Sequence, residues 1–133
     1  MRGSALLAAL ALAGSAQAAS PPPLPKLNLQ QEAALRCSAI FALVSGEQAR
    51  NAPVSAALPK LDARAREYFV VTTARLMDET AASRDGVAAL TRSRFAQVRD
   101  ELGKAKDPAA ARRAMLTPCL SLLDSELGPR PQK

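Results

Sequence analysis

Hydrophobic residues recur along most of this chain at the three- and four-residue spacing of helices that bury one face. No run of residues alternates between apolar and polar for long enough to predict a strand, and the β-like stretch 69–72 lies inside a helical pattern. Alanine, the strongest helix former, is abundant, whereas glycine occurs only six times. The pattern predicts an all-α fold over residues 28–127, a small bundle of four helices, or of five if Pro118 divides the last one.

The first predicted helix spans about residues 29–50. Asn28 is placed to cap this helix, and Gln31 stands three residues later, as in a capping box. A linker that contains Pro53 follows the helix. The apolar arc of the helix consists of Ala33, Cys37, Ile40, Phe41 and Val44.

The second predicted helix, about residues 60–79, is apolar on two sides. A helix of this kind either lies in the middle of a protein or contacts a partner. The core arc consists of Leu61, Ala65, Tyr68, Phe69, Thr72 and Leu76. The weaker stripe opposite consists of Ala63, Val70, Ala74 and Met77. Within this stripe, the candidate partner face is Val70, Ala74 and Met77.

The third predicted helix begins after Ser83, which is placed to cap it, and ends near Gly103. Arg94 falls inside the apolar arc of this helix. The other members of the arc are Val87, Leu90, Phe95, Val98 and Leu102. Three interpretations of Arg94 are open: the side chain extends to the edge of the core, pairs with a buried carboxylate, or meets an anionic ligand. Arg94 is therefore the candidate ligand contact.

Asp107 and Pro108 form a start signal for the fourth helix, a capping carboxylate followed by proline at the first helical position. Pro118 then either kinks this helix or breaks it and starts a fifth. The apolar arc after the proline consists of Cys119, Leu122, Leu123 and Leu127. Residues 128–133 begin with a Gly-Pro pair that stops helices, and we predict a flexible tail there.

Residues 1–18 have the features of a secretory signal peptide. Arg2 supplies the positive charge, residues 5–13 are an unbroken run of alanine and leucine, and an Ala-Gln-Ala cleavage site ends at Ala18. A membrane anchor is disfavoured, because a helix of that length spans about 13 Å of a bilayer core roughly 30 Å thick. We predict export to the periplasm or the medium, with no transmembrane span. The proline-rich residues 19–27 are predicted to form an extended lead.

The predicted export changes the interpretation of the two cysteines, because compartments outside the cytoplasm are oxidising. Cys37 and Cys119 lie near opposite ends of the predicted bundle, and each falls on an apolar arc. We predict a disulfide between them, worth roughly 4 kcal/mol of stability. The alternatives are two free buried thiols or a redox-active pair, although redox pairs usually have the short Cys-X-X-Cys spacing.

The composition excludes several classes of enzyme and metal site. The chain has no histidine, which excludes Ser-His-Asp catalysis, Cys-His catalysis and histidine-ligated metals. The adjacent acidic pairs 78–79 and 100–101 point about 100° apart on a helix and do not converge, and Glu32 has no acidic partner. No phosphate-binding, dinucleotide or calcium loop occurs. We predict a protein without catalytic residues, bound metal or cofactor.

The chain carries 18 basic and 12 acidic side chains, a formal charge of +6. Arg84, Arg92 and Arg99 form a loose basic stripe on the third helix. The stripe is either an ordinary solvated face or a surface that attracts anions. Nucleic acid is not an expected partner, because the predicted compartment lies outside the cytoplasm and few aromatic residues are present to stack on bases.

These observations lead to two hypotheses about function. The first is protein interaction in the cell envelope, as an adaptor, an inhibitor or a chaperone-like protein, through the candidate partner face. The second is a binder or carrier of an anionic or amphipathic envelope ligand, held between helices near Arg94.

Overall fold

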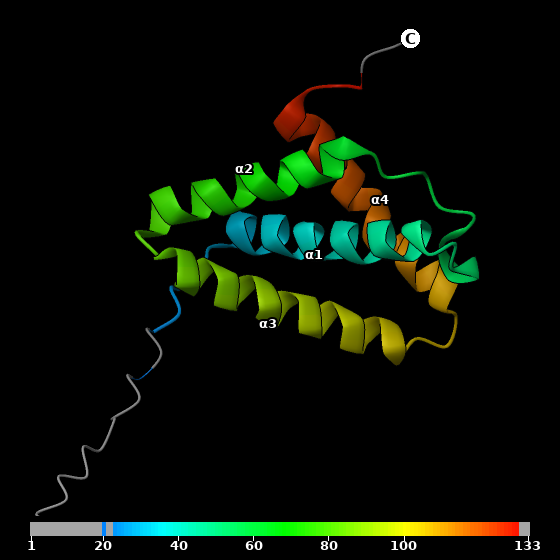
Figure 1. Cartoon of the computed structure of the whole chain (residues 1–133), viewed down its shortest axis with the longest axis horizontal. Coiled ribbons are helices and arrows are strands. Elements are labelled where there is room, and N and C mark those ends of the chain that lie inside the picture. Colours follow the sequence, from blue (N-terminus) through cyan, green and yellow to red (C-terminus); the bar gives the residue numbers. More distant parts are fainter. Residues whose placement is uncertain (1–19, 21–22, 131–133) are drawn as a thin grey trace, which may run out of the picture.

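The computed structural model describes residue 20 and residues 23–130, and this part of the chain is helical with no strand (Figure 1). The predicted all-α class is therefore confirmed. The described elements are α1 (Leu29–Ala49), the 3₁₀ turn η1 (Pro53–Ser55), α2 (Ala63–Thr80), α3 (Arg84–Gly103) and α4 (Pro108–Leu127). The predicted signal peptide lies outside the described residues, as do residues 131–133 of the predicted tail. None of the described helices combines the length and the apolar character that a bilayer crossing requires.

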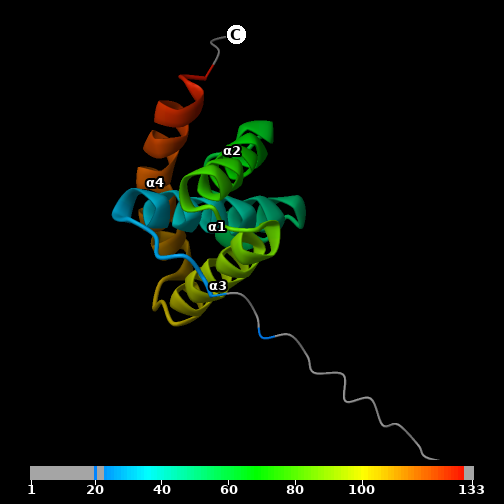
Figure 2. The same cartoon turned by 90° about the vertical axis from the view of Figure 1, so that its left-hand side faces the viewer.

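Helix α1 is the central element and contacts each of the other three helices. In Figure 1, α2 and α3 lie on either side of α1, and α4 crosses behind it. The view turned by 90° again shows α4 crossing α1 steeply (Figure 2). Because three helices surround it, α1 supplies most of the fully buried side chains, among them Leu35, Ile40, Phe41 and Val44.

The starts of the helices follow from their capping residues. The Asn28 side chain accepts a hydrogen bond from the backbone N–H of Gln31 at 2.8 Å, and the Gln31 side chain accepts one from the Asn28 N–H at 3.0 Å. The predicted capping box is therefore present. Helix α2 begins at Ala63, later than predicted, because Asp62 caps it by accepting a hydrogen bond from the backbone N–H of Arg64 at 2.9 Å.

Helix α4 continues through Pro118 instead of breaking there. A proline inside a helix costs roughly 3 kcal/mol, since one backbone hydrogen bond is lost and the ring crowds the preceding turn. Leu116 and Leu123, on either side of the proline, are both buried in the main core cluster. Packing on both sides of Pro118 therefore holds α4 as a single helix, and the bundle has four helices.

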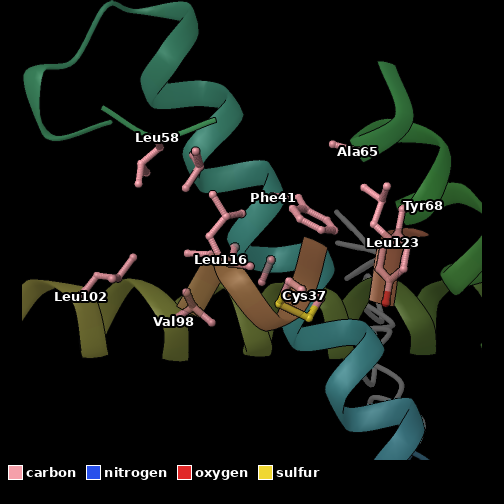
Figure 3. Close-up of a cluster of buried hydrophobic side chains, with 13 residues drawn as sticks. Cys37, Phe41, Leu58, Ala65, Tyr68, Val98, Leu102, Leu116 and Leu123 are labelled. Carbon is pink, nitrogen blue, oxygen red and sulfur yellow. A yellow bond between two sulfur atoms is a disulfide. The ribbon is translucent and has the colours of Figure 1, made fainter. Parts of the chain in front are cut away.

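The main core cluster joins all four helices near the middle of α1 (Figure 3). Cys37 and Cys119 form a disulfide with a Cα–Cα distance of 5.2 Å, so the predicted crosslink is confirmed. Phe41 packs edge-on against Tyr68, with ring centroids 5.3 Å apart. A second cluster ties the start of α1 to the turn between α2 and α3, and it consists of Leu35, Leu76, Val87 and Leu90.

Three residues that the sequence placed on apolar arcs are exposed instead. Phe69 is 36% exposed, Leu122 is 38% exposed, and Ala33 is also on the surface. The buried stripe of α2 is narrower than the predicted arc and consists of Ala65, Tyr68, Thr72 and Leu76. Phe69 follows Tyr68 directly and therefore points about 100° away from the middle of that stripe, toward solvent.

Candidate binding surface

The predicted partner face on α2 is only partly accessible. Val70 is 56% exposed and Ala74 is exposed. Met77 is half-buried and packs against the smaller core cluster beside the turn between α2 and α3. Val70 and Ala74 are thus free to contact a partner, whereas Met77 helps to hold α2 against α3. A partner-binding role for the three residues stays a prediction.

An apolar groove, which we call the α1–α2 groove, separates the middle of α1 from the start of α2. Its volume is about 570 Å³. Apolar and small side chains dominate its lining, among them Phe41, Ala42, Leu61 and Ala65. Phe69 also lines this groove and keeps 36% of its surface exposed, so an aromatic ring is available there to a bound molecule.

A second groove of about 370 Å³, the α1–α3 groove, lies on the other side of α1. It is lined by apolar residues such as Leu43 and Phe95 and by the arginines Arg50, Arg99 and Arg112. Ala42 lines both grooves, which therefore meet on the surface of α1. We call the two together the α1 trough.

One acidic and one basic side chain of the α1–α3 groove are fully engaged with each other. Glu47, whose side chain is 11% exposed, accepts hydrogen bonds from Nε and Nη2 of Arg112 at 2.6–3.0 Å, and one from the hydroxyl of Ser55. The hydrogen bonds from Arg112 outweigh the effect of burial and hold the pKa of the Glu47 carboxyl below its ordinary value. This pair joins α1 to α4 and η1 and leaves neither side chain available to a ligand.

Arg50, Arg66 and Arg99 are the cations of the trough that remain available. All three are exposed, and none pairs with a carboxylate of residue 20 or residues 23–130. Arg99 belongs to the predicted basic stripe. The other two stripe residues, Arg84 and Arg92, are exposed as well but line neither groove. The stripe thus contributes one residue to the trough.

Arg94, the predicted ligand contact, pairs with Glu32 across α1 and α3. Its Nε donates to Oε2 of Glu32 at 2.6 Å, and its Nη2 donates to Oε1 at 2.5 Å. The bonds from Arg94 lower the pKa of the Glu32 carboxyl, against a smaller effect of burial. Of the three interpretations of Arg94, the structure has the ion pair, although Glu32 is 37% exposed rather than buried. A ligand at Arg94 stays a prediction, and it would have to displace Glu32.

Sequence reasoning missed Arg50, Arg66 and Phe69 as members of a site. A narrower definition of the buried stripe on α2 would have predicted that Phe69 faces solvent. No spacing in the sequence could have brought Arg50 and Arg99 to the same groove, because Arg50 follows α1, Arg99 lies on α3, and the packing of helices is not periodic in sequence. The described residues include no cluster of three or more Cys, Asp or Glu side chains that could hold a metal ion.

Comparison with known proteins gives no family model that matches this chain. No curated protein has a significantly similar sequence, and no solved structure has a significantly similar fold.

Proposed function

We propose that this protein binds a partner protein through the α1 trough and performs no catalysis. The observation that carries the proposal is the exposed ring of Phe69 at an apolar groove of about 570 Å³. Within the described residues, five large apolar side chains are exposed, and two of them, Phe69 and Val70, are consecutive on α2. Apolar surface beside a concave site is typical of a binding surface.

The polar groups of the trough also favour binding over catalysis. They are mainly arginines and hydroxyls, and the Ser38 hydroxyl already donates to the backbone carbonyl of Ala34 at 3.0 Å. Catalysis by a serine nucleophile requires a base within hydrogen-bond reach. Of the two carboxylates that line the trough, Asp62 caps α2 and Glu47 is held by Arg112. This set of side chains is best suited to attracting anionic groups and packing against apolar ones.

The floor of the trough is held rigidly. The disulfide ties α1 to α4, and the pair of Glu47 with Arg112 ties the same helices further along. A surface that is ordered before binding loses less entropy when a partner docks. With the predicted signal peptide, we assign this role to the cell envelope, as an adaptor, an inhibitor or a chaperone-like protein.

Site-specific photo-crosslinking in the source cell tests the proposal. A photoreactive phenylalanine at position 69 should capture one protein as a defined covalent adduct. The matched control is the same amino acid at position 122, because Leu122 is 38% exposed against 36% for Phe69 but lies on α4, outside both grooves. Equal capture at the two positions would contradict the proposal. Retained lipid or glycan, lost in Phe69→Asp, would favour the ligand-carrier hypothesis instead.

A further inference from the structure

We propose that the partner segment in the α1 trough is an acidic amphipathic helix. Its apolar side chains would pack in the α1–α2 groove beside Phe69, and its carboxylates would face Arg50 and Arg99 across α1. This inference rests on the proposed function and names the chemistry of the partner at the same surface.

The charges of the trough indicate an acidic occupant. Four arginines line the two grooves, against the two carboxylates Asp62 and Glu47. Asp62 caps α2, and Glu47 is held by Arg112. Arg50, Arg66 and Arg99 therefore form no ion pair in the part of the chain that the structure describes, although the charge of Arg50 contributes to lowering the pKa of the Glu47 carboxyl. A partner that brings carboxylates would satisfy them, and the formal charge of +6 would assist its approach.

The apolar side of the trough indicates that the occupant is amphipathic. Phe41, Leu61 and Phe69 line the α1–α2 groove, so a purely acidic segment would leave this apolar surface in contact with water. The cationic groove begins at Ala42, where the apolar groove ends. One occupant can thus place apolar side chains on one side of α1 and carboxylates on the other.

The all-helical surface favours a helix as the occupant. A peptide that binds as a strand needs an unpaired sheet edge, and the described residues form no strand. An amphipathic helix instead lays its apolar face in a groove between helices. The floor of the trough includes the small side chains of Ala42 and Ser45, which allow the backbone of a second helix to approach α1 closely.

Selection from an unbiased peptide library tests the inference. The target is the oxidised full chain, and the library displays random peptides of about 16 residues, about 24 Å long as a helix. We expect the enriched peptides to carry a helical stripe of apolar residues flanked by Asp and Glu. Enrichment of neutral or basic peptides, or of none, would overturn the inference.

Charge reversal then tests which arginines contact the selected peptide. The double variant Arg50→Glu with Arg99→Glu should weaken binding about ten-fold, because two exposed attractions become repulsions. The matched control, Arg84→Glu with Arg92→Glu, changes two exposed arginines that line neither groove and should alter binding less than about two-fold. A peptide with its acidic residues changed to lysine should bind the first variant better than the natural chain. Equal losses in the two double variants would overturn the inference.

Two outcomes separate this inference from the proposed function. If position 69 captures a protein in the cell but the library enriches basic or neutral peptides, the proposed function stands and the acidic partner is wrong. If position 69 captures no more protein than position 122, the proposed function itself is wrong. Binding to vesicles of equal parts phosphatidylglycerol and phosphatidylcholine, lost in the Arg50 and Arg99 variant and unaccompanied by any enriched peptide, would assign the arginines to lipid and overturn the inference.

Discussion

The side of α1 that faces α4 and the side that faces α3 are held by different kinds of contact. Toward α4, the disulfide and the pair of Glu47 with Arg112 are both inside the protein, and the two charged side chains are 11% and 13% exposed. Toward α3, the pairs Arg36 with Glu101 and Arg94 with Glu32 are more exposed, at 21–43%. The contrast separates a crosslinked contact with a nearly buried ion pair from a contact whose ion pairs reach the surface.

Such a division suits a small binding protein. A bundle of this size buries a modest core, so a crosslink contributes a large share of its stability. Exposed side chains outside the crosslinked contact can then serve binding, because exposed ion pairs contribute little to stability. The exposed ring of Phe69, on α2, also lies outside the crosslinked contact between α1 and α4.

The largest expected effect is that of removing the disulfide. Reduction, or the double variant Cys37→Ala with Cys119→Ala, should lower the free energy of unfolding by roughly 4 kcal/mol, because the bond closes a loop of 82 residues. Urea unfolding with and without dithiothreitol measures the loss. The alanine variant is the control, since the reductant should leave its midpoint unchanged. A loss below about 1 kcal/mol would show that the contact between α1 and α4 does not depend on the crosslink.

The next largest expected effect is the difference in stability lost when the two kinds of ion pair are broken. Glu47→Gln removes the carboxylate of the nearly buried pair and should cost about 2–3 kcal/mol, because Arg112 is left without its counter-charge. Glu101→Gln makes the same change in an exposed pair and should cost less than about 1 kcal/mol. Denaturant midpoints of the two variants give the comparison directly. Equal costs would contradict the distinction between the two sides of α1.

Acidification should weaken the same contacts. The pKa of Glu47 is lowered below its ordinary value of 4.5, chiefly by the hydrogen bonds from Arg112. Ionised Glu47 therefore contributes its stability fully above about pH 4.5, and that stability is lost as the pH falls through the lower folded-state pKa. Glu32 and Glu101 are shifted in the same direction, chiefly by hydrogen bonds from Arg94 and Arg36. The unfolding free energy should fall below pH 4.5 and fall less steeply in Glu47→Gln, as titrations of denaturant midpoints would show.

The sequence predicted those features that follow from spacing within one helix. Asn28 and Asp107 cap helices because capping depends on the next three residues. Cys37 and Cys119 pair because each lies on an apolar face and no other cysteine competes. The fold class and the crosslink were therefore within reach of the sequence alone.

The features that depend on contacts between helices were not predictable in this way. Pairing with a carboxylate is one of the three interpretations of Arg94 that the sequence leaves open, but the sequence does not identify Glu32, which is 62 residues away. The spacing within the first helix does not distinguish Glu47, although its hydrogen bonds with Arg112 and Ser55 make it the most engaged acidic side chain of the trough. Spacing alone places Phe69 on the predicted core arc. The width of a buried stripe depends on how closely the neighbouring helices approach, which spacing does not reveal.

The smallest expected effect concerns the turn that joins α2 to α3. Ala81 ends α2 with φ of 53°, in the left-handed region, where the Cβ of an L residue is crowded and glycine is not. Ala81→Gly should therefore raise the unfolding free energy by about 0.5–1 kcal/mol, despite the greater freedom of glycine in the unfolded chain. Ala74→Gly, on the exposed face of the same helix, is the control and should lower the free energy by about 1 kcal/mol.

If the natural alanine holds α2 and α3 at the angle that opens the trough, the stabilised variant should also bind the selected peptide differently from the natural chain. Stabilisation with unchanged peptide affinity would show that the turn serves the fold alone.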